Sequence, residues 1–141
     1  MNSANYVLAY FVKDEKILLL YRANTGFANN CYGLAGGKIE PYESAQQAVI
    51  REMAEELDII VRPQDTQLVH VMSFKGNTNG DHLVLVFAIN SWQGALYNRE
   101  SHKHDHLSWF WLSNLPDNLM LRHRQIIEYI LQQQRYSQEG Y

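Results

Sequence analysis

The chain has 141 residues, of which 46% are hydrophobic and 19% are charged, and its formal net charge is -3. This length and composition predict one globular domain over residues 1–141 and exclude a disordered or fibrous chain. Because the chain is slightly acidic, it offers no basic surface for DNA or RNA, and we expect no polymeric nucleic acid among its partners.

The sequence carries no recognisable export or membrane signal. The apolar stretch at the start is interrupted by Lys13 and Asp14, and no basic segment precedes it, which argues against a signal peptide. No run approaches the roughly 20 apolar residues that span a bilayer. Cys31 is the single cysteine, so no internal disulfide can form. We therefore expect a cytoplasmic protein without a membrane partner.

The first predicted elements are strands. YVLAYFV at 6–12 and KILLLYR at 16–22 are rich in strand-forming residues and are separated by a charged turn, which predicts a β-hairpin. After a loop, CYGLAGGKI at 31–39 predicts a short strand that is interrupted by glycine and ends before Pro41.

A helix follows this strand. Ser44 and Gln47 have the spacing of a capping box, and good helix formers follow them, which predicts a helix that runs to about Leu57. IIVRP at 59–63 then predicts a short strand.

The second half of the chain predicts a hairpin, a strand and a helix. TQLVHVMSFKG at 66–76 and HLVLVFAI at 82–89 flank an Asn79-Gly80 turn signal. LSWFWLSNL at 107–115 predicts a further strand, and apolar residues recurring at three and four between 121 and 131 predict a C-terminal helix. This order of elements favours an α/β or α+β fold with a mixed β-sheet covered by two helices.

Three glutamates of the predicted first helix lie close together. Glu52, Glu55 and Glu56 fall within an arc of about 100°, at the edge of the face that can turn toward a core. Like charges at this spacing repel each other, and more strongly where water is excluded. Carboxylates suit hard divalent cations such as Mg²⁺. A solvated acidic face is the alternative interpretation.

Two glycines precede this helix. A residue without Cβ lets the backbone approach a metal or a ligand closely, so a carbonyl of Gly36 or Gly37 is expected to complete a metal site.

The segment from residue 37 to residue 59 resembles the Nudix box, the signature of the Nudix (MutT-like) hydrolases. That signature is G-x5-E-x7-R-E-U-x-E-E-x-G-U, where U is a bulky aliphatic residue. The matching residues are Gly37, Glu43, Arg51, Glu52, Met53, Glu55, Glu56 and Ile59. Asp58 replaces the second glycine, which bears on the end of the helix and not on the carboxylates.

The resemblance implies a Nudix-type α/β/α sandwich with a mixed β-sheet. It also implies a pyrophosphohydrolase that cleaves the diphosphate linkage of a nucleoside diphosphate joined to another group X, for example a (d)NTP to NMP and pyrophosphate. The expected partner is thus a small-molecule nucleotide, and the family leaves a homodimer open. The alternative is a catalytically silent Nudix-fold sensor that binds a nucleotide; such a protein typically loses box carboxylates, which this chain keeps.

The resemblance also assigns roles by position. Mg²⁺ or Mn²⁺ would be held by the Gly36 carbonyl and by the three glutamates, which are the implied catalytic residues, with Glu52 the usual candidate for the base. Gly37, Glu43 and Arg51 look like the structural residues of the box. The full set of implied metal ligands is Gly36, Glu52, Glu55 and Glu56.

Further candidates lie outside the box. Family members often add one carboxylate from a later loop, and here Glu100 and Asp105 both qualify without the sequence choosing between them. Candidate substrate-binding residues are Arg22, Phe27, Tyr32, Lys38 and Phe74.

Histidines and tryptophans near residue 105 also call for an interpretation. The alternating His102, His104 and His106 could be transition-metal ligands, but no further ligand completes a site, so a solvated loop is expected. Trp109 and Trp111 are expected to pack in the core rather than to stack on a base.

Overall fold

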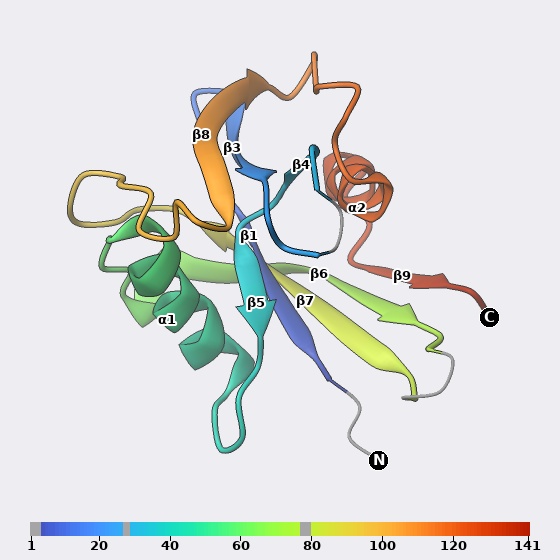
Figure 1. Ribbon diagram of the computed structural model, residues 1–141. Helices are drawn as coiled ribbons and strands as arrows, with labels where there is room; N and C mark the ends of the chain where they lie inside the picture. Colours follow the sequence, from blue (N-terminus) through green and yellow to red (C-terminus); the bar gives the residue numbers. More distant parts are fainter. Residues whose placement is uncertain (1–3, 27–28, 77–79) are drawn as a thin grey trace.

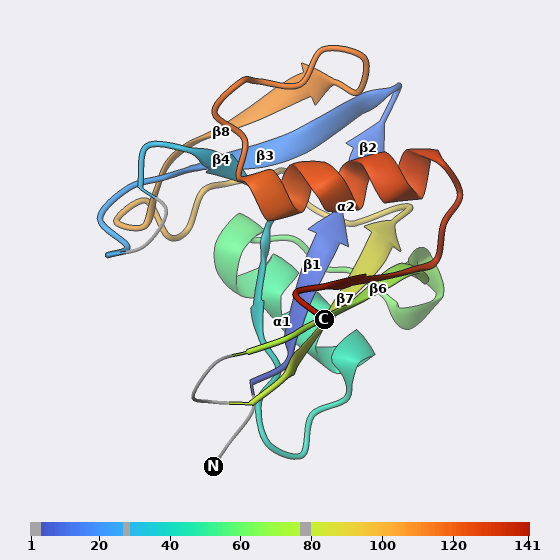
Figure 2. The same ribbon diagram turned by 90° about the vertical axis from the view of Figure 1, so that its right-hand side faces the viewer.

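The computed structural model describes residues 4–26, 29–76 and 80–141. Within these residues the fold consists of two sheets and two α-helices (Figures 1 and 2). The elements are β1 (Tyr6–Tyr10), β2 (Val12–Lys13), β3 (Lys16–Arg22), β4 (Tyr32–Gly33), β5 (Gly36–Lys38), α1 (Ala45–Leu57), a 3-10 turn (Pro63–Asp65), β6 (Thr66–Phe74), β7 (His82–Ile89), β8 (His104–Trp111), α2 (Leu121–Leu131) and β9 (Tyr136–Glu139).

The larger sheet has five strands in the order β5-β1-β7-β6-β9. It is mixed, because β1 pairs with β7 and β6 pairs with β9 in parallel, whereas the other two pairs are antiparallel. The second sheet is built around β3, which pairs antiparallel with β2, β4 and β8. The predicted fold class, a mixed sheet with two helices, is confirmed.

Two apolar cores lie on the two faces of the larger sheet. One joins α1 residues such as Val49 and Met53 to Val7 of β1, and the other joins Ile126 and Ile127 of α2 to Leu8 of β1. Because successive side chains of a strand point to opposite faces, Val7 and Leu8 mark the two sides of one sheet. The helices therefore cover opposite faces, as in an α/β/α sandwich.

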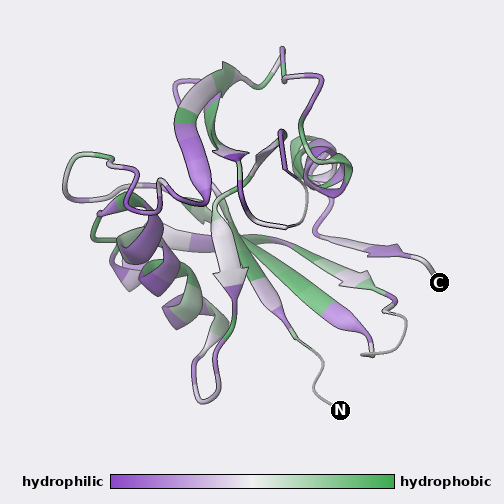
Figure 3. Ribbon diagram, viewed as in Figure 1, coloured by the Kyte–Doolittle hydropathy of each residue, from purple (hydrophilic) through white to green (hydrophobic). Residues whose placement is uncertain are grey.

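Helix α1 begins where its sequence predicts. The Ser44 hydroxyl accepts a hydrogen bond from the Gln47 N–H at 3.0 Å, and the Gln47 side chain accepts one from the Ser44 N–H at 2.9 Å. This reciprocal capping box satisfies two donors that the first turn would leave unpaired. Figure 3 shows hydrophilic and hydrophobic residues together on α1, in keeping with one buried side and one solvated side.

The predicted N-terminal hairpin is wrong in its first strand. Strand β1 pairs with β5 and β7, and only the two residues of β2 form a hairpin with β3, through Val12 and Ile17. The reason is burial: Val7, Leu8 and Ala9 are all buried, and a continuous apolar run belongs to a central strand covered on both faces.

Other boundaries also differ from the prediction. The strand expected at 59–63 is reduced to one bridge between Ile60 and Gln93. Strand β8 begins at His104 and ends at Trp111, and β9 was not expected, since its sequence YSQE is polar. The antiparallel pairing of β6 with β7 is confirmed, while Asn79 of the predicted turn lies outside the described residues.

The two tryptophans of β8 are not in the core, contrary to the prediction. Trp109 is 37% exposed and Trp111 is 50% exposed, and the ammonium of Lys16 lies 4.5 Å from the ring centre of Trp111. Within the part of the chain that the structure describes, no helix is long and apolar enough to cross a membrane.

Candidate active site

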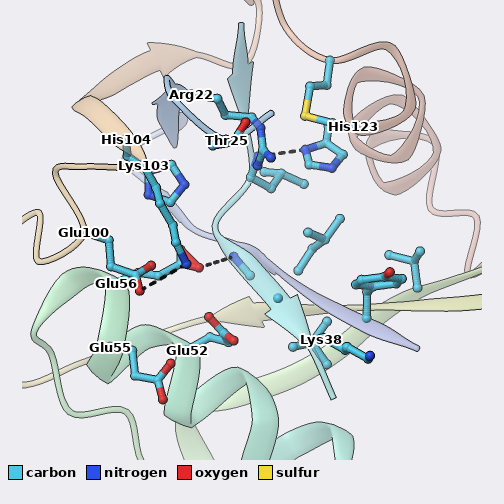
Figure 4. A pocket seen from close by; sticks show the side chains of 18 of the residues that line it. Arg22, Thr25, Lys38, Glu52, Glu55, Glu56, Glu100, Lys103, His104 and His123 are labelled. Atoms are coloured by element: carbon cyan, nitrogen blue, oxygen red, sulfur yellow. Dashed lines mark hydrogen bonds and ion pairs between the residues drawn. The ribbon is translucent and has the colours of Figure 1, made fainter. Parts of the chain in front are cut away.

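A cavity of about 800 Å³ lies beside α1 and β5. Its walls come from distant parts of the chain: β1, the end of β3, β5, one side of α1, the end of β6, the segment that leads into β8, and the start of α2. Figure 4 shows the three glutamates of α1 on one side of this cavity and His123 of α2 on the other.

Four carboxylates line the cavity: Glu52, Glu55, Glu56 and Glu100. Glu52 is 9% exposed and Glu56 is 3% exposed, whereas half of the Glu55 side chain is exposed. Helical spacing brings the first three together, and Figure 4 shows Glu100 near Glu56. A group of acids that is partly withdrawn from water repels itself unless a positive charge is supplied.

Glu56 is the least satisfied member of this group. Its Oε1 accepts a hydrogen bond from the Gly36 N–H at 3.3 Å, but its Oε2 is buried without a hydrogen-bond partner. Burial raises the pKa of Glu56 well above its ordinary value, and the neighbouring Glu52 and Glu100 raise it further. Ionisation of Glu56 beside the other carboxylates is therefore unfavourable, and a bound cation would stabilise the ionised form.

The donor chemistry of this wall fits a hard divalent cation. Carboxylate and carbonyl oxygens are the ligands that Mg²⁺ and Mn²⁺ prefer, and the buried Glu56 Oε2 has an unused acceptor site. Among the described residues, no group of three or more His, Cys, Asp or Glu side chains is arranged to hold a metal ion as it stands. The features that suit a cation are the oxygen ligands and the crowding of their negative charge. Side chains on α1 and backbone carbonyls of β5 could hold such an ion.

Gly36 and Gly37 let the backbone of β5 pass close to its neighbours. A Cβ on Gly36 would lie 2.1 Å from the Val7 carbonyl oxygen, and a Cβ on Gly37 would lie 2.3 Å from Glu52 Oε1. At either position a side chain could be admitted only if the neighbouring atoms moved. The two glycines therefore allow β5 to pair with β1 and to lie directly against the carboxylate of Glu52.

Arg51 ties α1 to the segment before it. Its Nε and Nη2 donate to the two carboxylate oxygens of Glu43 at 2.7 and 3.0 Å, and the guanidinium lowers the pKa of Glu43. Nη1 reaches Glu52 at 2.9 Å and Glu55 at 3.2 Å, and Nη2 also donates to the Lys38 carbonyl. A bidentate ion pair of this kind fixes the relative orientation of the two side chains as well as neutralising their charges.

A basic group of side chains also lines the cavity: Arg22, Lys38, His102, Lys103 and Arg122. The Lys103 ammonium lies 3.9 Å from Glu100, so acid and base meet at one edge of the cavity (Figure 4). The cavity thus offers carboxylates for a cation and, on other parts of its wall, basic side chains that can donate hydrogen bonds to a ligand.

Two buried histidines complete the walls. His104 is 8% exposed, its Nδ1 has no hydrogen-bond partner, and burial together with Arg22 and Lys103 lowers its pKa to about 4. His123 accepts the Leu34 N–H at Nδ1 at 2.9 Å, and burial lowers its pKa to about 3. Both rings are therefore neutral near pH 7. The solvated loop predicted for the alternating histidines is wrong for His104.

The structure places most of the predicted site residues in the cavity wall. Those that line the cavity are Arg22, Gly36, Gly37, Lys38, Glu52, Glu55, Glu56, Phe74 and Glu100. Glu43 and Arg51 lie behind this wall and contact it through the bonds described above. Phe27 lies outside the described residues.

Asp105 and Tyr32 are not in the cavity wall. The Asp105 side chain is 66% exposed and pairs with His106 Nδ1 at 2.9 Å. The Tyr32 hydroxyl lies 2.8 Å from His106 Nε2, and its ring meets Phe110 edge-on. Of the two candidate carboxylates, Glu100 is thus the one beside the cavity.

Sequence reasoning missed several cavity residues, namely Asn24, Lys103, Met120, Arg122 and His123. No local spacing connects them to the box. Their only sequence signal is position: Lys103 follows the candidate Glu100 by three residues, and the others lie within two residues of the end or start of a predicted element.

Comparison with known proteins agrees with this arrangement. The family model described as NUDIX domain matches residues 3–130. The chain is 35% identical over 117 residues to a protein named ADP-ribose pyrophosphatase from Methanocaldococcus jannaschii, covering 82% of this chain and 66% of the length of that relative. It is 30% identical over 113 residues to a protein named CTP pyrophosphohydrolase from Escherichia coli K12, covering 80% of this chain and 78% of the other.

Solved structures give the same result. A MutT NUDIX hydrolase from Burkholderia pseudomallei superposes with a TM-score of 0.80 at 29% identity, covering 91% of this chain and 98% of that one. The match to the family model spans most of the chain, and the carboxylates of the box line one cavity. The chain therefore belongs to the Nudix family and is a Nudix hydrolase.

Proposed function

We propose that this Nudix hydrolase uses Mg²⁺ or Mn²⁺ to cleave the diphosphate linkage of a nucleoside diphosphate joined to another group. Glu52, Glu55, Glu56 and the Gly36 carbonyl would hold the cation, and Glu100 would add the carboxylate from the later loop. The observation that carries the proposal is the buried, unpartnered oxygen of Glu56 beside two further carboxylates. A cation placed there would relieve the repulsion that raises the pKa of Glu56.

The chemistry follows from the residues around that wall. A bound divalent cation would neutralise negative charge on the phosphoryl oxygens and would lower the pKa of a bound water. Glu52, whose carboxylate Arg51 holds at the cavity wall, would take the proton of the attacking water. The water oxygen forms a bond to phosphorus while the phosphoanhydride P–O bond breaks, and the leaving phosphate keeps the electron pair.

The basic side chains bind the rest of the substrate charge. Lys103 is close enough to Glu100 to exchange that carboxylate for a phosphate oxygen of the substrate. Arg22 and Lys38 line the same cavity and supply further donors. Holding the diphosphate between acids and bases aligns the phosphorus with the water, which is the main task of the protein in phosphoryl transfer.

Two substrate classes lead the test panel. The named relatives act, by their names, on ADP-ribose and on CTP, and a cavity of about 800 Å³ is large enough for a nucleotide of either kind. We therefore infer a free nucleotide or nucleotide conjugate as substrate, with CTP, other (d)NTPs and ADP-ribose as the compounds to compare.

The experiment measures phosphate or pyrophosphate release from this panel with Mg²⁺, with Mn²⁺ and with EDTA. Glu56→Gln should lower kcat by about a hundredfold or more, since it removes one charge from the cation site. Glu128→Gln, at an exposed position of α2, is the matched control and should leave kcat unchanged. Wild-type inactivity across the panel, or full activity of Glu56→Gln, would overturn the proposal. Nucleotide binding without turnover would favour the silent sensor.

A further inference from the structure

Strand β9 lies outside the part of the chain that matches the family model. The match ends at residue 130, and β9 runs from Tyr136 to Glu139. The strand pairs in parallel with β6, and the register places Glu139 beside Phe74. Figure 2 shows β9 beneath α2 at the edge of the sheet. A segment beyond the matched region thus reaches the end of β6 that borders the cavity.

Arg122 of α2 connects this strand to the cavity. Its Nε donates to Glu139 Oε2 at 3.2 Å, and its guanidinium carbon lies 4.1 Å from the centre of the Phe74 ring. Arg122 and Phe74 line the cavity, whereas Glu139 does not. Glu139 can therefore affect a ligand only through Arg122.

The contact between Glu139 and Arg122 contributes more to position than to stability. The two side chains are 42% and 38% exposed, and an ion pair in such surroundings adds little to the free energy of unfolding. The pair does hold the guanidinium over the Phe74 ring. Its two Nη groups have no hydrogen-bond partner among residues 4–26, 29–76 and 80–141, so their donors remain available to a ligand.

The position of Arg122 decides what that ligand is. The reacting diphosphate belongs at the carboxylates of α1, and Figure 4 shows His123, the neighbour of Arg122 in the sequence, across the cavity from them. The ring of Phe74 lies against Arg122, and Tyr6 and Val84 add further apolar surface to the lining of the same cavity. A planar base with hydrogen-bond acceptors on its edge fits such a wall, and a second phosphate does not.

We propose that Arg122 binds the base of the nucleotide substrate and that Glu139 of β9 is the residue that positions it. The inference rests on the proposed function, because it assumes that the diphosphate of a nucleotide lies at the carboxylates. It makes β9 a substrate-positioning element added to the catalytic fold.

The test compares substrates with and without a base. CTP and ADP-ribose carry one, and ribose 5-triphosphate does not. Arg122→Met keeps the aliphatic stem and should raise KM for CTP and ADP-ribose about tenfold, the loss expected for one charged hydrogen-bond donor, with kcat within about twofold. The KM for ribose 5-triphosphate should not change. Glu139→Gln should raise KM about threefold for the two nucleotides only.

A charge exchange separates positioning from structure. The double variant Arg122→Glu with Glu139→Arg again places opposite charges at the two positions and should melt close to the wild-type temperature, but it removes the cavity donor and should keep the KM for CTP and ADP-ribose high. Recovery of the wild-type KM in this double variant would overturn the inference. An equal rise of KM for ribose 5-triphosphate in Arg122→Met, or no rise for either nucleotide, would overturn it too.

Failure of the proposed function has a different signature. If the wild-type protein hydrolyses none of the three compounds, the affinity for CMP and AMP, measured by calorimetry, still tests the role of Arg122. Arg122→Met should then bind both about tenfold more weakly than the wild type. Equal affinity of the two proteins would overturn the inference.

Discussion

At Gly37 the backbone of β5 passes so close to Glu52 that no side chain fits between them. A Cβ at this position would lie 2.3 Å from Glu52 Oε1 and 2.6 Å from its Cδ. The atoms in the way belong to the end of a flexible side chain, which can rotate aside. At Gly36 the atom in the way is the Val7 carbonyl oxygen, which belongs to β1 and cannot move without the sheet. The two neighbouring glycines thus serve different requirements.

Gly37→Ala should therefore impair catalysis without unfolding the protein. The added methyl group displaces the carboxylate of Glu52, and a misplacement of about 1 Å at a reacting group can cost about a hundredfold in kcat. The melting temperature should stay close to that of the wild type in the absence of divalent cations. Gly36→Ala is the contrasting variant and should lower the melting temperature clearly, because it separates β5 from β1. Wild-type kcat in Gly37→Ala would show that the position of Glu52 does not limit the reaction.

The residues of the box could be predicted from sequence because short-range spacing connects them. Glu52, Glu55 and Glu56 share one side of a helix whatever the rest of the chain does. Arg122 and His123 reach the cavity only because α2 packs on the larger sheet. The local sequence pattern does not predict this packing. Glu100 and Asp105 looked equivalent in the sequence.

The structure separates these two acids by place. Asp105 is the second residue of β8, and side chains alternate along a strand, so it lies opposite the buried His104 and faces solvent. Glu100 precedes the strand and lines the cavity.

At the scale of elements, α1 ends at a residue in a left-handed conformation. Asp58 has φ 59° and ψ 35°, and its N–H donates to the Ala54 carbonyl. Glycine adopts this conformation without steric cost, whereas Asp tolerates it at a cost of up to about 1 kcal/mol. The contact from Arg99 to Asp58 is 3.5 Å long and more than half exposed on both sides, so it compensates little.

Asp58→Gly should accordingly raise the free energy of unfolding by about 0.5 kcal/mol. Removing the left-handed strain raises the free energy of unfolding by up to about 1 kcal/mol. The greater conformational freedom of glycine in the unfolded chain offsets part of this increase. Asp58→Ala keeps the strain and loses the polar side chain, so it should be less stable than the wild type. Urea unfolding of the three proteins gives the order. A glycine variant below the alanine variant would contradict this account of the helix end.

Elements were predictable where one segment carries its own signal, as α1 does with its capping box. Elements were not predictable where a segment becomes a strand only through its pairing with other strands. The sequence YVLAYFV predicts the first strand of a hairpin. Strand β1 is instead a central strand, because both of its faces pack against apolar residues. The polar sequence of β9 has no strand signal, and it forms a strand because the edge of β6 offers unpaired backbone groups.

At the scale of the whole molecule, the cavity collects charge from both sheets and both helices. His104 begins β8 of the second sheet, and His123 belongs to α2 beside the larger sheet. Both are buried, and cationic groups face them: Arg22, His102 and Lys103 for His104, and Arg22 and Arg122 for His123. A proton on either ring would be buried beside other positive charges, so the folded protein excludes it.

Acid should therefore weaken the whole fold through these histidines. Their pKa values are lowered from 6.5 to about 4 and about 3, so between those values and 6.5 the folded protein binds fewer protons than the unfolded chain. The free energy of unfolding then falls as the pH falls, by up to about 1.4 kcal/mol per pH unit for each histidine, and their contribution is complete above about pH 6.5.

His123→Asn isolates one of the two contributions. Its amide oxygen can still accept the Leu34 N–H, but the side chain no longer titrates. Urea unfolding between about pH 7 and about pH 5, without divalent cations, should show a shallower loss of stability in this variant than in the wild type. Equal slopes for His123→Asn and the wild type would mean that His123 is protonated in the folded protein, and that the walls of the cavity open to admit the charge.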